Sequence, residues 1–229
     1  MMSKDIVERA TDSYKVMLAY HQQVSSMFKL VDNRLASGDS ARKLLPISQN
    51  QLFSVCDYEY MLLDNYTLFN HKEPYDSGLP FWLGRFYVNA DLLDDDSTID
   101  DCPVKQVQYI AFVWTWVGCD DPNLADAEEP ECWIAITEPK PTNPETRVYD
   151  VATMIWKWIR IETTTEKESD GWISGRFYPN NLGSELNGFW QVKRFPLKDV
   201  SSIYQIYKLI VEPLTEKLAQ LEGGASIKG

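Results

Sequence analysis

Apolar positions recur every three or four residues along the first part of the chain. The series consists of Val7, Ala10, Tyr14, Met17, His21, Val24, Phe28, Val31 and Leu35. This spacing places them on one side of a helix, so we expect a long amphipathic helix over residues 3–36. The mean step of about 3.5 residues is typical of helices that pack side by side. Gly38 follows the last apolar position and is expected to end the helix.

A similar pattern occupies the other end of the chain and predicts a helix over residues 199–222. Its apolar stripe consists of Val200, Ile203, Tyr207, Ile210, Leu214, Lys217 and Leu221, widened by Tyr204, Val211 and Leu218. Asp199 or Ser201 is expected to cap its start. Pro213 lies inside the pattern and predicts a kink or a break into two helices, because proline lacks the amide hydrogen. The remaining residues, 223–229, are expected to form a flexible tail.

Between the two helices the pattern changes to short runs of aromatic and β-branched residues, which are typical of strands. The predicted strands are 81–90, 104–118, 132–137, 156–163, 171–178 and 188–195. Polar segments containing Gly, Pro and Asn separate them, which indicates an antiparallel meander. We therefore predict one α+β domain over 1–222, with a mostly antiparallel sheet of five to six strands in 80–196. We expect a helix at 51–70, and 148–159 fits a helix as well as a strand.

The charge balance narrows the range of partners. The chain carries 34 acidic and 22 basic residues, a net charge of −12. A nucleic-acid partner is disfavoured because its phosphates need basic residues, whereas a basic protein is favoured. No apolar run is long enough for a membrane helix, and the charged start is not a signal peptide. We therefore expect a cytoplasmic protein whose four cysteines are free thiols.

One stretch resembles a metal-dependent nuclease site in its order of residues. Asp121, or its neighbour Asp120, precedes Glu138 and Lys140, which gives the order Asp…Glu-x-Lys. Carboxylates in such an order bind Mg²⁺, and the lysine activates the attacking water. Pro139 interrupts the motif, so our preferred interpretation is a strand running out into a loop. We expect no metal and no cofactor, and the nuclease remains the alternative.

Tryptophan is the one residue type that could form a binding face in the predicted sheet. Trp114 and Trp116 share one face of their strand, as do Trp156 and Trp158. Such rings can stack on a sugar, a base or a peptide. The preferred interpretation is that they pack beneath the terminal helices. A third hypothesis for function, a small-ligand sensor, depends on these rings forming an aromatic pocket.

The sequence therefore predicts a non-catalytic, macromolecule-binding protein, with the nuclease and the ligand sensor as alternatives. A protein partner is expected. If the N-terminal helix is partly uncovered, it offers Tyr14, Met17, Val24 and Phe28 to a second copy, and a symmetric dimer follows. If the helix packs wholly on its own domain, the protein can be a monomer.

Overall fold

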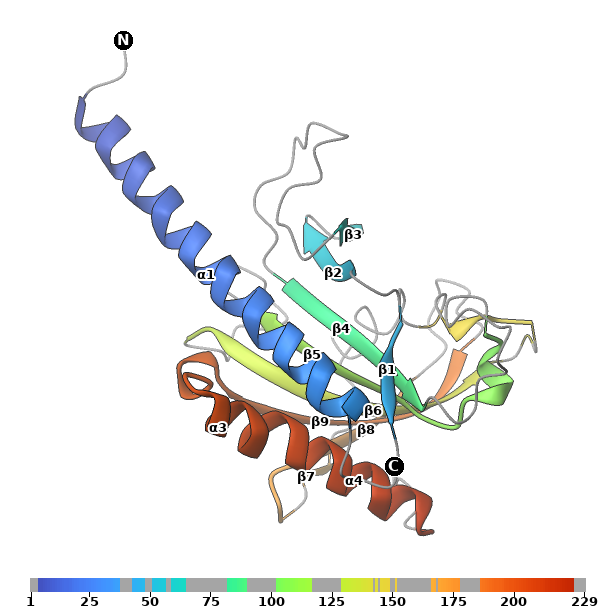
Figure 1. Ribbon diagram of the computed structural model, residues 1–229. Coiled ribbons are helices and arrows are strands. Elements are labelled where there is room, and N and C mark those ends of the chain that lie inside the picture. The colour runs from blue at the N-terminus through green and yellow to red at the C-terminus, as the bar shows by residue number, and fades with distance from the viewer. Residues whose placement is uncertain are drawn as a thin grey trace.

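The computed structural model places two helical segments on one face of a large antiparallel sheet (Figure 1). It describes residues 4–37, 43–47, 51–56, 59–64, 82–89, 102–116, 129–141, 143, 145–148, 151, 166–167, 169–177 and 186–224. Only the backbone is described for some of these residues, including all of 51–56 and 59–64. The α+β class predicted from the sequence is confirmed.

The helical elements lie mainly at the two ends of the chain. They are α1 (Lys4–Ser37), the 3₁₀ turns η3 (Val104–Gln106) and η5 (Leu197–Asp199), α3 (Ile203–Ile206), the π-helical turn η6 (Tyr207–Val211) and α4 (Glu212–Glu222). The strands are β1 (Leu44–Pro46), β2 (Gln51–Cys56), β3 (Glu59–Asp64), β4 (Trp82–Asn89), β5 (Ile110–Trp116), β6 (Glu131–Pro141), β7 (Glu166–Lys167), β8 (Ile173–Phe177) and β9 (Leu186–Pro196). Strands β4 to β9 occupy the region in which five to six strands were predicted.

The sheet has the order β3-β2-β4-β5-β6-β9-β8-β7, and β1 pairs with a further part of β4. Every pair among the described strands is antiparallel. Strands β4 to β6 form one meander and β7 to β9 another, and the long strands β6 and β9 join the two. Strands at the middle of the sheet are buried on both faces, which explains their almost continuous apolar sequences.

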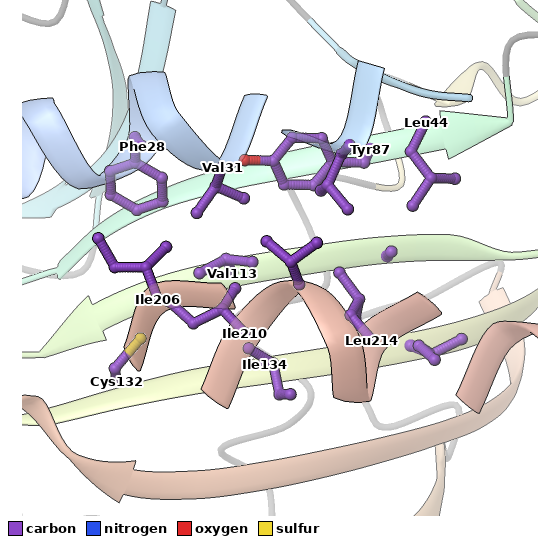
Figure 2. Close-up of a cluster of buried hydrophobic side chains, with 14 of the residues drawn as sticks. Phe28, Val31, Leu44, Tyr87, Val113, Cys132, Ile134, Ile206, Ile210 and Leu214 are labelled. Carbon is purple, nitrogen blue, oxygen red and sulfur yellow. The ribbon is translucent and has the colours of Figure 1, made fainter. Parts of the chain in front are cut away.

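The first core lies between the sheet and the helices. From α1 it takes Val24, Met27, Phe28, Val31 and Leu35, and from the C-terminal helix Ile206, Ile210, Leu214, Leu218 and Leu221. Both sets meet sheet residues such as Val113 and Ile134 (Figure 2). Each fully buried side chain of this kind contributes about 1.5–3 kcal/mol to stability, so this contact fixes both helices on the sheet.

An ion pair inside this helix–sheet contact adds a polar tie. Arg85 on β4 donates to both carboxylate oxygens of Asp32 on α1, with Nε–Oδ1 3.3 Å and Nη2–Oδ2 3.1 Å. The arginine side chain is only 1% exposed. Because both groups leave water together and bond at two points, the pair fixes the position of α1 along β4.

The second core lies on the opposite face of the sheet. It contains the aromatic side chains Phe86, Phe112, Trp114, Trp133, Phe177 and Trp190, with Ile47, Val104, Val107, Val148 and Val151 packed among them. The rings form a row across three strands: Phe86 on β4 meets Phe112 on β5 at 5.4 Å, Phe112 stacks on Trp114 at 4.5 Å, and Trp114 meets Trp133 on β6 at 5.2 Å. The two faces of the sheet therefore have different characters, one aliphatic and helix-covered and one aromatic.

The C-terminal helix differs from the predicted helix in a way that Pro213 explains. Ser202, rather than Asp199 or Ser201, caps its start by accepting a hydrogen bond from the Gln205 amide at 3.2 Å. Instead of breaking at Pro213, the helix widens into the π turn η6 just before it. A π turn leaves room for a proline, which has no amide hydrogen to donate.

Several segment predictions were wrong or lie outside the described residues. Residues 51–56 and 59–64 form the paired strands β2 and β3, not a helix, and 104–106 form a 3₁₀ turn ahead of strand β5. The predicted strand at 156–163 and almost all of the ambiguous segment 148–159 lie outside the described residues.

Strand β6 also runs further than predicted. It continues through Glu138, Pro139 and Lys140 and stays paired with β9 throughout, so the interpretation of this stretch as a strand exit was wrong. Pairing with β5 ends at Thr137, so in the described sheet these last residues pair with β9 alone. A strand tolerates proline where one side needs no hydrogen bond. Gly188 opposes Pro139, and a Cβ there would meet the Glu138 carbonyl oxygen.

Candidate functional site

The first half of α1 extends beyond the sheet (Figure 1). Every side chain described between Glu8 and Ala19 is exposed. Tyr14, Val16 and Leu18 are 56%, 68% and 40% exposed, although they are large and apolar. We call the helix from Lys4 to Ala19 the α1 overhang.

Tyr20 and His21 mark the point at which α1 meets the sheet. The Tyr20 hydroxyl donates to Thr115 Oγ1 on β5 at 3.1 Å, and burial raises the pKa of Tyr20 above its usual range. His21 is buried and its ring meets Tyr20 edge to face at 5.1 Å. Beyond this point the stripe turns inward, so two of the four predicted association residues, Val24 and Phe28, belong to the core (Figure 2). The side chain of Met17 lies outside the described part of the chain.

A second exposed apolar area lies at the start of the C-terminal helix. Ile203, Tyr204 and Tyr207 are 64%, 70% and 44% exposed. They are neighbours on the helix surface, because residues three and four apart share a face. We call these three residues the α3 patch. Helix α1 contacts both α3 and the π turn, so the α3 patch lies on the helix beside which α1 passes.

The α3 patch was not predicted from the sequence, because the prediction assumed one regular helical spacing across Pro213. Reading back from Leu214 and Ile210 in steps of three and four places Tyr207 and Ile203 on the buried stripe. The π turn at 207–211 holds an extra residue and so shifts the helical phase of the residues before it. As a result Ile206 faces the core, and Ile203 and Tyr207 face outward. Pro213 was the available signal, because proline is one of the residues at which the regular hydrogen bonding of a helix is interrupted.

Both exposed areas are close to electrically neutral in a strongly acidic chain. The α1 overhang holds three basic residues, Lys4, Arg9 and Lys15, and three acidic ones, Asp5, Glu8 and Asp12. Lys15 pairs with Asp12 at 3.2 Å. Beside the α3 patch, Lys208 pairs with Glu212 at 2.7 Å and lies over the Tyr207 ring. A partner that binds at these areas therefore meets a surface with almost no net charge.

The tryptophans proposed from the sequence do not form an exposed binding face where the structure describes them. Trp114 is 5% exposed and lies within the aromatic core, between Phe112 and Trp133. The side chain of Trp116, and all of Trp156 and Trp158, lie outside the described residues. Among the side chains that the structure describes, the most exposed aromatic rings are instead tyrosines on the helices.

The aromatic core ends in a small polar cluster at the start of β6. Arg194 bonds both carboxylate oxygens of Glu131, at 2.9 and 3.1 Å, and lies over the Trp133 ring. The indole nitrogen of Trp133 donates to the same carboxylate at 2.6 Å. These contacts bind the three side chains to one another, so the cluster fixes strands β6 and β9 in register.

Two other buried polar atoms on the aromatic face have no partner. Thr137 Oγ1 and Trp190 Nε1 make no hydrogen bond in the structure, although their residues are 0% and 3% exposed. Thr137 and Trp190 lie opposite each other on β6 and β9. A buried donor or acceptor without a partner costs about 1–3 kcal/mol, so a polar group placed between them would stabilise the fold.

Glu138 and Lys140 of the nuclease-like motif bond to each other. Lys140 Nζ lies 3.1 Å from Glu138 Oε1, and both side chains project from the same face of β6. Lys140 also lies over the Phe189 ring, with Arg176 over the same ring. Asp121, the third member of the motif, lies outside the described residues. Among the described residues, no three side chains of a metal-ligating kind cluster where they could share an ion.

The described cysteine side chains, Cys102 and Cys132, and the described histidine, His21, are all buried. Cys102 and Cys132 are free thiols and are buried, and burial raises the pKa of Cys132 well above its usual range. Burial lowers the pKa of His21 to about 4. The His21 Nε2 atom has no hydrogen-bond partner, so the expected buried histidine is present but is not bonded at that atom.

Comparison with known proteins gives no relative from which a role could be transferred: no family model, curated protein or solved structure matches the chain. Among the described helices, none combines the length and the apolar character needed to cross a membrane.

Proposed function

We propose that this chain is a non-catalytic cytoplasmic protein that binds another protein through the α1 overhang and the α3 patch. One observation carries the proposal. The large apolar side chains that are exposed, among those the structure describes, all belong to these two areas: Tyr14, Val16, Leu18, Ile203, Tyr204 and Tyr207. On α1, Tyr14 and Leu18 share one face, whereas Val16 lies on another, and Ile203, Tyr204 and Tyr207 are neighbours on α3. Exposed apolar side chains that are neighbours on a surface are typical of an interaction site. Tyrosine is also among the residues that contribute most at such sites.

The nuclease-like motif fits a structural role better than a catalytic one. Glu138 and Lys140 neutralise each other, and Glu138 has its side chain only one-fifth exposed. A carboxylate that binds Mg²⁺ needs its oxygens free for the ion. Mg²⁺- or Mn²⁺-dependent cleavage of nucleic acid that Glu138→Ala abolished would overturn the proposal of a non-catalytic protein.

The binding proposal is tested by comparing tagged variants in the cells that make this protein. Leu18→Glu and Tyr204→Glu place a charge in each exposed area without touching the core. Gln23→Glu, at an exposed position on the docked half of α1, adds the same charge as a matched control. After chemical cross-linking and mass spectrometry, we expect a protein linked to residues of the α1 overhang or α3 patch. Its yield should fall with both variants and not with the control. Equal yield from all four proteins would contradict the proposal.

The acidity of the chain bears on the partner. With a net charge of −12, a basic rim around the apolar contact would be attracted and an acidic one repelled. Binding to a basic partner should therefore weaken as salt concentration rises, because salt screens attraction between exposed charges.

A small-ligand sensor remains a second candidate, favoured by Thr137 and Trp190. An oxygen atom of a ligand placed between Thr137 and Trp190 could accept hydrogen bonds from the Trp190 indole nitrogen and from the Thr137 hydroxyl. The other residues of this core are apolar, so the ligand would have to be neutral there. Thr137→Val keeps the shape and removes the hydroxyl. A loss of stability of about 1 kcal/mol or more in urea unfolding would favour a bound polar group; a gain in stability would show that the hydroxyl has no partner.

A further inference from the structure

The apolar stripe of α1 runs further than the surface that covers it. The pattern begins at Val7, whereas among the described side chains of α1 burial begins only at Tyr20 and His21. The α1 overhang of 16 residues, Lys4 to Ala19, is about 24 Å long at 1.5 Å per residue. Helices of this length are only marginally stable in water when nothing packs on them. A partner that covers the α1 overhang would therefore stabilise it as a helix.

We propose that the partner is a second copy of this chain, bound by reciprocal exchange: the α1 overhang of each copy packs on the α3 patch of the other. This inference rests on the proposed function, because it names the partner of the same surface. It differs from the dimer expected from the sequence, since Val24 and Phe28 are core residues and the α3 patch takes their place.

The two-part shape of the surface fits a two-fold dimer. In such a dimer a residue on one part of the surface contacts the other part in the partner, and the same contact occurs twice. The α1 overhang leaves the body as a continuous straight helix, so within one chain it does not fold back onto the α3 patch (Figure 1). In a dimer with a two-fold axis, the overhang of each copy can reach the α3 patch of the other copy, so the same contact forms twice. Tyr14 and Leu18, which are four residues apart and share one face of the overhang, would meet the three exposed apolar side chains of the patch.

The local charge balance permits an identical partner at this surface. Two copies of a chain with net charge −12 repel each other over most of their surfaces. The α1 overhang carries equal numbers of acidic and basic residues, and Lys208 is the single charged residue between Val200 and Val211, where it is paired with Glu212. Two acidic molecules can therefore approach here without opposing like charges, and Asp12 and Lys15 on each overhang give both signs to the contact.

A pair of charge substitutions tests the exchange in the full-length protein. Leu18→Glu puts an acid in the α1 overhang, Tyr204→Lys puts a base in the α3 patch, and the double variant places them opposite each other. Light scattering of wild type should give twice the 26.4 kDa chain mass at high concentration. Each single variant should dissociate about 100-fold more readily, since a charge buried without a partner costs several kcal/mol. The double variant should recover most of the affinity, and Gln23→Glu should behave as wild type.

Three results would overturn the inference. A wild-type mass of 26.4 kDa at every concentration rejects the second copy. A double variant as weak as the singles, or a Tyr204→Lys variant as tight as wild type, rejects the exchange between overhang and patch. Circular dichroism of each variant shows that the fold is retained. A monomer whose cross-linked partner is still lost in Leu18→Glu would reject the second copy and leave the proposed function standing.

Discussion

Arg85 and Asp32 meet where α1 packs on the sheet, and the arginine is almost fully enclosed. Removing the carboxylate would leave a buried guanidinium without its main counter-charge. We therefore expect Asp32→Ala to lower the free energy of unfolding by about 3–5 kcal/mol in urea titration. The exposed pair between Glu129 and Lys198 is the control, and Glu129→Ala should change the same quantity by less than about 1 kcal/mol. Similar losses from both would contradict a special role for the buried pair.

His21 makes the stability of the fold depend on pH. Its pKa is about 4 in the folded chain because burial disfavours the charged ring, whereas an unfolded chain holds histidine near its ordinary value of 6.5. As pH falls below about 6.5, the unfolded chain takes up the proton first, so the fold loses stability. We expect this group to contribute a loss of about 2 kcal/mol between pH 7 and pH 5. In His21→Leu the decrease over that interval should be smaller by this amount; an unchanged slope would show that His21 does not cause it.

At this scale the sequence predicted burial better than exposure. The apolar period correctly placed Val24, Phe28, Val31 and Leu35 on one side of α1, and the buried His21 lies on the same stripe. The period could not show that the sheet leaves Tyr14 uncovered. How far the sheet extends along α1 depends on the rest of the fold and not on the pattern of one helix. Trp114 illustrates the same limit, since strand alternation gives the face on which a ring lies and not what covers that face.

Long, strongly periodic elements were predictable and short paired ones were not. Helix α1 and strands β4, β5, β6, β8 and β9 lie at or near their predicted positions because their patterns are sustained over many residues. The sequence pattern predicted a helix at 51–70, where the structure has the strands β2 and β3. These two strands are joined by Asp57 and Tyr58 alone, a pair without the glycine that usually marks a tight hairpin turn. Pairing with β4 is a long-range contact that single-sequence patterns do not contain.

The α1 overhang should be dispensable for folding. A chain that begins at Ala19 loses only side chains that are exposed where they are described, so its unfolding free energy per monomer should stay within about 1 kcal/mol of the Leu18→Glu full-length variant. A chain that begins at Lys29 also loses Val24, Met27 and Phe28 and should fail to fold cooperatively. Chemical unfolding measures both. A large loss in the shorter truncation would mean that the overhang packs on its own domain.

For the whole molecule, net charge and apolar contact act in opposite directions. Raising the salt concentration shortens the range of the repulsion between two acidic copies to about 10 Å near 0.1 M. The apolar contact itself is not weakened by this change. We therefore expect self-association to tighten between low and moderate salt in sedimentation equilibrium, whereas binding to a basic partner would weaken. A dimer that dissociates as salt rises would indicate that charge pairs, and not Tyr14, Leu18 and the α3 patch, hold it together.

Hydrogen exchange in the α1 overhang tests the central claim most directly, because it reports whether a partner covers that helix. In dilute wild-type protein, the backbone amides of residues 8–19 should exchange rapidly, since an uncovered helix of this length opens readily. At high concentration they should become protected, and Leu18→Glu should abolish this protection while amides of the docked half of α1 stay protected throughout. Rapid exchange of residues 8–19 at every concentration, in the wild-type protein alone and with its cross-linked partner, would contradict the account.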